Sequence, residues 1–318
     1  MEYGNGGAHQ VIAGKAYDYA AGIFPDIFGA GRDRVSFVTY SDWPDVESSG
    51  QRGPKLGLVS VIARWSNNRH FYNPANGQNF FRNNYESEYN ARERIGTFYK
   101  MAVQAYCSGD RERGLNFLGA ASHFLTDLAS PPHTGDQLTY AQSATRPTTN
   151  ILPNPVMLLN HRDFEFAAQK EICGGFLDRY TANTHRFDFH TMSPYDMAGV
   201  LAARSYQHYG RVGGGRILHP LPWVVAQRRK EVAQIMLPIA VDVTAAMLVR
   251  FAQEVSSEES LDLNQSENIR LDGIGGKIYD YGYVRLNMLI IAWAAIAYVV
   301  LSMIVIIFIV AMVTRKTP

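Results

Sequence analysis

The sequence predicts an all-α domain followed by one membrane-spanning helix, for three reasons. Apolar residues recur at three- and four-residue steps through several long segments. No segment shows the sustained alternation of apolar and polar residues that is typical of a half-buried strand. Residues 286–314 contain no charged side chain, and about 20 apolar residues are enough to cross a bilayer as a helix. We expect the folded domain in residues 1–255, a polar linker in 256–285 and the membrane helix in 286–314.

The individual helices follow from periodicity and from capping residues. They are expected over residues 9–24, 86–107, 110–128, 158–183, about 194–209 and 224–255. Ser108-Gly109 suits the turn of an antiparallel helical pair, Ser193 and Asp196 form a capping box, and Pro238 is expected to kink the last helix. Residues 26–82 and 134–155 are rich in Gly, Asn or Pro, so we expect irregular loops there that carry function.

Composition excludes several classes of protein. Hydrophobic residues make up 47% of the 318 residues, which is enough for a sizeable core. The formal net charge is +1, so no global field draws in nucleic acid. The two cysteines, Cys107 and Cys173, form no CxxC pair, which excludes a thiolate zinc knuckle and argues against a disulfide framework.

The amino-terminal residues contain no basic segment followed by an apolar segment, so no secretory signal is visible. We therefore expect a tail-anchored, single-pass membrane protein, and the missing leader favours the cytosolic face for the domain. Basic residues flank the membrane helix equally, with Lys277 and Arg285 before it and Arg315 and Lys316 after it, so charge does not set its orientation. A mature form that has lost its leader remains an alternative.

His123 and Asp127 lie four residues apart on a predicted helix, so both side chains can reach one ion from the same helical face. Pro131 and Pro132 should end this helix near residue 129 and turn His133 back toward the pair. His161 and Glu165 repeat the same spacing. Mixed nitrogen and oxygen donors suit zinc, so the sequence predicts a metal centre.

Three earlier residues complete a pattern. They are His9 at the start of the first helix, Asp42 in Tyr40-Ser-Asp42, and His70 in His70-Phe-Tyr-Asn-Pro74. Together with HxxxDxxxxxH at 123–133 and HxxxE at 161–165, they resemble the zinc-dependent phospholipase C family of bacteria, the relatives of the clostridial alpha-toxin catalytic domain. The resemblance covers roughly residues 1–255 and implies an all-α fold with up to three Zn²⁺ ions.

The resemblance also implies which residues hold each ion. Asp42, His70, His123 and Asp127 would hold one zinc, His133, His161 and Glu165 a second, and Asp127, His9 and the amino terminus at Met1 a third. Family members supply that terminus from a tryptophan, whereas this chain begins with Met1 and has no tryptophan before Trp43. We therefore hypothesise that the amine and carbonyl of Met1 act as ligands.

The implied reaction is hydrolysis of a phospholipid on the glycerol side of its phosphodiester, which yields diacylglycerol and a phosphorylated head group. Clustered dications would neutralise the phosphodiester and activate water near neutral pH. Asp42 and Glu165 are the expected catalytic residues, with Asp42 orienting or deprotonating the water. Asp45 is an alternative to Asp42, although the Tyr-Ser-Asp42 context fits the family better.

Two other functions remain open. Single-strand-specific zinc nucleases share the fold and commonly have aspartate where this chain has Glu165; the glutamate and the membrane helix favour membrane phospholipid as the partner and make nucleic acid unexpected. A structural metal cluster in a membrane-perturbing or assembly protein is the non-catalytic alternative. Four aromatic residues near the ligands form either a wall for a choline-like cation or core packing: Trp43, Trp65, Phe71 and Tyr72. Head-group preference and oligomeric state stay open.

Overall fold

A computed structural model describes residues 7–29, 31–44, 70–77, 90–135, 155–213 and 222–257. The predicted linker, the membrane helix at 286–314, Met1, Asp45 and Trp65 lie outside the described residues.

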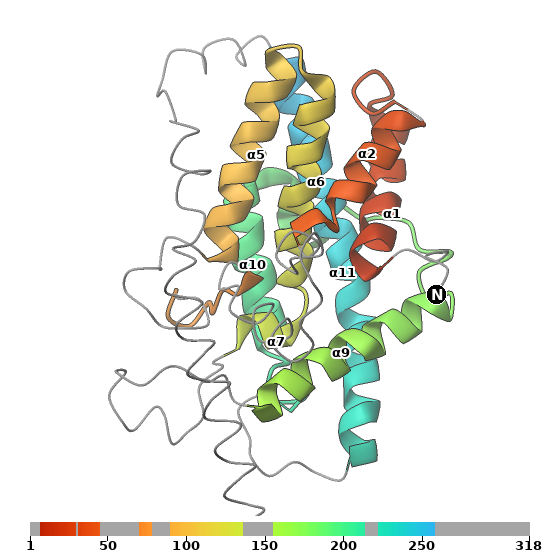
Figure 1. Cartoon of the computed structure of the whole chain (residues 1–318), viewed down its shortest axis with the longest axis vertical. Coiled ribbons are helices and arrows are strands. Elements are labelled where there is room, and N and C mark those ends of the chain that lie inside the picture. The colour runs from red at the N-terminus through yellow and green to blue at the C-terminus, as the bar shows by residue number, and fades with distance from the viewer. Residues whose placement is uncertain are drawn as a thin grey trace, which may run out of the picture. The chain divides into compact units, whose positions relative to one another are not determined.

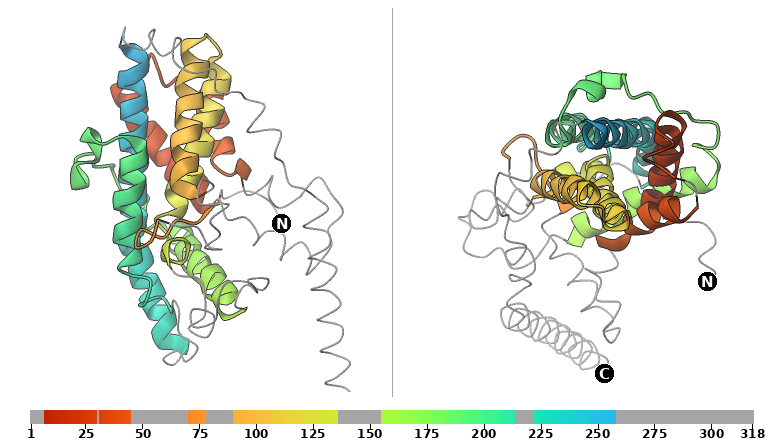
Figure 2. Two further views of the ribbon diagram at one scale, coloured as in Figure 1. Left: turned by 90° about the vertical axis from the view of Figure 1, so that its left-hand side faces the viewer. Right: turned by 90° about the horizontal axis from the view of Figure 1, so that it is seen from above.

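The described part is helical and contains no β-strand, which confirms the all-α prediction. Its elements in chain order are α1 (Ala8–Ile23), α2 (Arg32–Tyr40), α5 (Ala91–Cys107), α6 (Arg111–Asp127), α7 (Pro131–Thr134), α9 (Pro155–Cys173), the 3₁₀ helix η3 (Arg186–Thr191), α10 (Pro194–Tyr206) and α11 (Pro222–Ser256). Helices α5, α6, α10 and α11 run along a common direction, and α9 crosses the lower half of α11 (Figure 1; Figure 2).

Helix α11 supplies the centre of the core. Its residues 239–248 are all buried, and it packs against α1, α9, α5 and α6. Within the described ranges, its segment Val224–Ser256 is the one helix long and apolar enough to cross a membrane, and 78% of its most apolar window is buried. A helix that is apolar on all sides is expected either in a core or in a bilayer. Burial against the other helices assigns α11 to the core.

Helices α5 and α6 form the predicted antiparallel pair. Gly109 in the turn between them has φ +89°, a conformation that glycine adopts without the steric cost of a side chain. Asn90 and Asp110 cap the two helices by accepting hydrogen bonds from the backbone N–H groups of Glu93 and Arg113. These local signals explain why the two helices begin where they do.

The prediction that residues 26–82 lack regular structure was wrong for α2. This helix contains Val35, Val38 and Thr39, whose β-branched side chains lower helix propensity and hid it in the sequence. It forms because Phe37 becomes fully buried and because the helix packs along α6. Tertiary packing therefore overrides local preference here, and the end of α2 brings Ser41 and Asp42 to the site described below.

The fourth predicted helix, residues 158–183, was placed too far toward the carboxyl end. The observed helix α9 ends at Cys173 because Gly174 and Gly175 follow it. Gly175 has φ +79°, and the N–H of Phe176 donates to the carbonyl of Glu171 at 3.0 Å, which closes the helix end. His161 and Glu165 lie well inside α9, so this error does not affect their spacing.

Candidate metal centre

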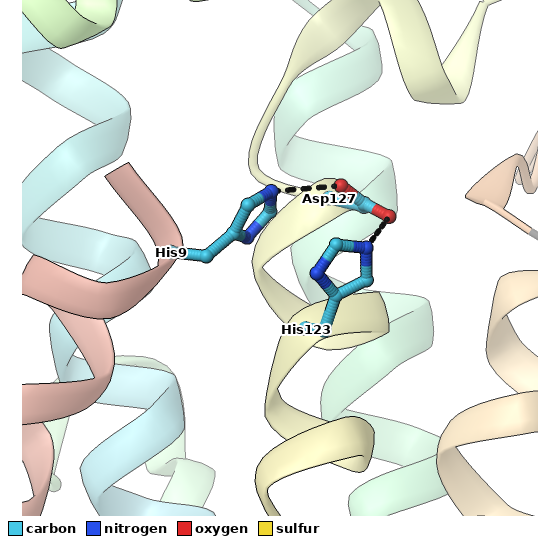
Figure 3. Close-up of side chains that lie close together, drawn as sticks. All are labelled: His9, His123 and Asp127. Atoms are coloured by element: carbon cyan, nitrogen blue, oxygen red, sulfur yellow. Dashed lines mark ion pairs between the residues drawn. The ribbon is translucent and has the colours of Figure 1, made fainter. Parts of the chain in front are cut away.

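Asp127, the last residue of α6, lies at the centre of a cluster of imidazoles (Figure 3). Its side chain is 4% exposed. The Oδ2 atom lies 2.6 Å from His70 Nδ1 and 3.3 Å from His123 Nε2, and the Oδ1 atom lies 3.4 Å from His9 Nε2. We call His9, His70, His123 and Asp127 the Asp127 group. Segments that are far apart in the sequence thus meet at one buried carboxylate.

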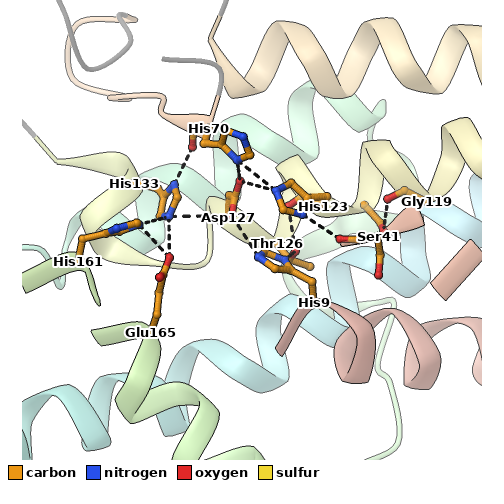
Figure 4. Close-up of polar contacts among 11 residues, drawn as sticks. His9, Ser41, His70, Gly119, His123, Thr126, Asp127, His133, His161 and Glu165 are labelled. Atoms are coloured by element: carbon orange, nitrogen blue, oxygen red, sulfur yellow. Dashed lines mark hydrogen bonds and ion pairs between the residues drawn. The ribbon is translucent and has the colours of Figure 1, made fainter. Parts of the chain in front are cut away.

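A second cluster lies beside the first (Figure 4). His161 Nε2 lies 2.8 Å from Glu165 Oε1, and His133 Nε2 lies 3.2 Å from the same oxygen. The Nε2 atoms of His133 and His161 are 2.5 Å apart. We call these three residues the His133 group. His133 Nε2 is also 3.9 Å from Asp127 Oδ1, so the two groups adjoin.

The two helical pairs have the geometry that their spacing predicts. His123 and Asp127 face each other on α6, and His161 and Glu165 face each other on α9. Since α6 ends at Asp127, the chain is free to turn, and the N–H of His133 donates to Ser130 O at 2.9 Å within this turn. The proline break therefore returns His133 to Asp127.

Backbone carbonyls fix the orientation of two rings. His123 Nδ1 lies 2.8 Å from Ser41 O, and His133 Nδ1 lies 2.8 Å from His70 O. A carbonyl oxygen accepts hydrogen bonds only, so each Nδ1 carries a hydrogen, and the Nε2 atom of each ring is the one that faces the carboxylates and is available to a metal ion. Metal-binding histidines are commonly held in this way.

The His70 segment is tied to its neighbours from both sides. The N–H of Tyr72 donates to His133 O at 3.0 Å, and the N–H of Ala91 donates to Phe71 O at 3.1 Å. Arg92 Nη1 donates to the Tyr72 hydroxyl at 3.1 Å. Phe71 is buried and stacks on the His133 ring at 4.7 Å between centroids. Phe71 and Tyr72 therefore act in packing, as the core alternative for these aromatic residues predicts.

A hydrogen-bond relay holds His9. His9 Nδ1 donates to Thr126 Oγ1 at 2.5 Å, and the Thr126 hydroxyl donates to His123 O at 2.9 Å. Because the hydroxyl hydrogen is used on the carbonyl, Thr126 accepts from His9 Nδ1, and His9 Nε2 is the atom that faces Asp127. Sequence reasoning missed Thr126, since no spacing rule marks a hydroxyl that acts on a distant ring.

Thr126→Val should weaken zinc binding at the His9 position by about 10- to 100-fold, the range seen when a partner of a metal ligand is removed. Valine keeps the shape of threonine but leaves His9 Nδ1 without its acceptor. Zinc content measured against a series of chelator concentrations gives the affinity. Thr126→Ser keeps the hydroxyl and should bind zinc as the parent does; equal weakening in both variants would contradict the relay.

Gly119 lets α2 approach α6 closely enough for Ser41 to reach His123. A Cβ atom on Gly119 would lie 2.5 Å from Phe37 O and 2.9 Å from Tyr40 Cβ. Both atoms belong to or adjoin the backbone of α2, so the helix would have to move. The glycine, one turn before His123, therefore sets the position of the Ser41 carbonyl.

Gly119→Ala should lower the free energy of unfolding by about 1–3 kcal/mol, the usual cost of overpacking, and should also weaken zinc binding. Urea unfolding and zinc titration measure the two effects. Gly22→Ala is the matched control, because Gly22 lies in α1 with no atom within 4 Å of the added Cβ. The control should stabilise α1 by about 0.5–1 kcal/mol. Wild-type stability in Gly119→Ala would show that α2 can shift freely.

Charge keeps the carboxylates ready for a cation. Burial would raise the pKa of Asp127, but the charges of His123, His133 and His70 outweigh it and hold that pKa well below its usual range. Partial desolvation of the Glu165 carboxyl would raise its pKa, but the charges and hydrogen bonds of His161 and His133 hold that pKa below its usual range. Burial would lower the pKa of His133, but Asp127 and Glu165 raise it to about 9. Without metal, protons therefore occupy this site, and a dication would displace them.

The residues present fit zinc. Each group combines imidazole nitrogens with a carboxylate, the donor set that zinc prefers. Potential ligand atoms of His9, His123 and Asp127 all lie within 4.8 Å of one another, and so do those of His133, His161 and Glu165.

Asp42 lies near the two groups but outside their hydrogen-bond network. It follows α2 and lines the same cavity as His9, Asp127 and Glu165, but its carboxylate makes no hydrogen bond to the described members of either group. Of the expected ligands within the described residues, Asp42 alone is not within hydrogen-bond distance of another. The Met1 hypothesis remains a prediction, because residue 1 lies outside the described ranges.

No family model and no curated protein matches this sequence. Among solved structures, it is similar to the alpha-toxin of Clostridium absonum, with a TM-score of 0.57 and 18% identity over 82% of this chain and 66% of the toxin chain. The alpha-toxin of Clostridium perfringens from avian strain SWCP matches with a TM-score of 0.51 and 16% identity over 79% of this chain and 64% of the toxin. The chain thus spans slightly less than two thirds of either toxin. These similarities establish the fold.

Proposed function

We propose that this chain, which has the phospholipase C-like fold of the clostridial alpha-toxins, is a zinc-dependent phosphodiesterase acting on phospholipids. The reaction would cleave the glycerol-side phosphodiester of a phosphatidylcholine-like lipid and release diacylglycerol and a phosphorylated head group. The observation that carries the proposal is the meeting of the Asp127 group and the His133 group, which adjoin at 3.9 Å. The fold alone would not be enough to assign this function, because one fold can host many functions.

The donor residues would be divided among three zinc ions. His70, His123 and Asp127, with Asp42, would hold one zinc; His133, His161 and Glu165 would hold a second; and His9, Asp127 and the terminus at Met1 would hold a third. When bound, zinc supplies the positive charge that stabilises a phosphodiester as its negative charge develops, and it makes water a better nucleophile near neutral pH.

The protein's own residues would orient the metal-binding rings and set which carboxylates contact water and substrate. The carbonyls of Ser41 and His70 hold the rings of His123 and His133 in one orientation. Glu165 is 48% exposed at its side chain, whereas Asp127 is 4% exposed. Glu165 can therefore contact water and substrate while Asp127 serves as the buried anchor. Asp42 lines the same cavity and is the second carboxylate available to orient or deprotonate water.

We further propose that residues 286–314 anchor the domain to the bilayer that contains its substrate. Tethering raises the local concentration of lipid at the site.

The test uses the full chain and three measurements: diacylglycerol release from phosphatidylcholine vesicles, cleavage of single-stranded DNA, and zinc per chain. The proposal predicts diacylglycerol release that a chelator removes and that added zinc restores. Cleavage of DNA without lipid hydrolysis would favour the nuclease alternative. Bound zinc with neither activity would favour a structural metal cluster.

A further inference from the structure

A cavity of about 390 Å³ adjoins the two donor groups. Its lining includes His9, Asp42, Asp127 and Glu165. The volume falls within the range of pockets that bind small molecules. The proposed function accounts for these four residues but not for the rest of the lining.

Most of the remaining lining is apolar, and much of it comes from three helices. Ile12 lies on α1, Phe164 and Ala168 on α9, and Ala233, Met236 and Leu237 on α11; all six line the cavity and all are buried. Core side chains usually pack without a space of this size. Alanine at 168 and 233 leaves room that a larger apolar side chain would fill.

Two exposed side chains flank Glu165 at the cavity. Arg162 and Phe166 both line it, and the exposed fraction is 72% for the Arg162 side chain and 72% for Phe166. A guanidinium suits an anionic phosphate, and an aromatic ring in water suits contact with lipid. The exposed part of the lining thus combines charge and apolar surface, as an amphiphilic ligand requires.

We infer that this cavity binds an acyl chain of the phospholipid while its phosphodiester lies against the Asp127 and His133 groups. The inference rests on the proposed function and adds a determinant of chain-length selectivity. A zwitterionic head group or a nucleotide would gain little from a wall of alanine, leucine, isoleucine and phenylalanine, whereas each methylene group moved from water into it is stabilised.

The experiment compares dibutanoyl, dihexanoyl and dioctanoyl phosphatidylcholine as soluble substrates of the full chain, at one fixed concentration of a non-ionic detergent. We expect kcat/KM to rise roughly fourfold for each methylene group added to the acyl chain that the cavity holds, until the cavity is filled. Ala233→Leu fills part of the cavity and should reduce the preference for dioctanoyl over dibutanoyl lipid by at least about tenfold, with zinc content unchanged.

Ala226→Leu is the matched control, because Ala226 is an exposed residue of the same helix. It should keep the wild-type profile. The same chain-length profile in Ala233→Leu and Ala226→Leu would overturn the inference, even if both variants hydrolyse lipid.

Direct binding separates this inference from the proposed function. If the protein hydrolyses no phospholipid, the proposed function fails, and displacement of a fluorescent fatty acid by dioctanoylglycerol still tests the cavity. Displacement in wild type and Ala226→Leu but not in Ala233→Leu would support an acyl site. Absence of probe binding, or equal displacement in all three proteins, would overturn it.

Discussion

Asp127→Asn is expected to lower turnover on phospholipid by on the order of a thousandfold and to remove zinc from the Asp127 group. Asparagine keeps the shape of the side chain but removes the negative charge. The three rings within 3.4 Å of its oxygens would then lose the anion that offsets a cation among them. Diacylglycerol release and zinc per chain are the two measurements.

Asp188→Asn provides the control for Asp127→Asn. Asp188 is exposed and has φ 58°, a left-handed conformation that asparagine adopts readily, so the same chemical change should be harmless there. We expect wild-type zinc content and turnover. If Asp127→Asn also retained its zinc and its turnover, the buried carboxylate would not be the shared anchor of the site.

Glu165→Gln is expected to lower turnover by about a hundred- to a thousandfold while leaving the Asp127 group loaded with zinc. Glutamine keeps the size of the side chain but cannot offer the carboxylate that lies 2.8 Å from His161 and 3.2 Å from His133. The side chain is half exposed, so folding should be little changed. His133→Ala should have the same effect on turnover, because it removes a ligand of the same ion.

The control for Glu165→Gln lies on the same helix. Glu171 contacts α11 through Gln234 at 2.7 Å and Lys230 at 3.7 Å and touches neither donor group. Glu171→Gln should therefore keep full zinc content and turnover. Loss of zinc from the Asp127 group in Glu165→Gln would mean that the two groups bind as one unit rather than as separate positions.

Much of the site was predictable because it depends on helical periodicity. Residues four apart on a helix lie on the same face, as do His123 with Asp127 and His161 with Glu165. Pro131 and Pro132 limit how far α6 can continue. The resemblance to the phospholipase C family added His9, His70 and Asp42. The structure places His9 and His70 beside Asp127 and leaves Asp42 at the cavity wall.

The supporting contacts were not predictable from sequence, because they join segments that are distant along the chain. The Ser41 carbonyl reaches His123 only because α2 packs on α6 at Gly119, and α2 itself has weak helical propensity. The Thr126 relay depends on where α1 meets α6. By contrast, Gly174-Gly175 did mark the end of α9, and the predicted continuation to residue 183 overlooked a local signal.

The most direct measurement is anomalous diffraction from crystals of the full chain at the zinc absorption edge. The account predicts zinc peaks about 2.0–2.2 Å from the Nε2 atoms of His133 and His161 and from a carboxylate oxygen of Glu165, and at similar distances from the Asp127 group. An active, zinc-containing protein whose anomalous peaks lie away from both groups would contradict it.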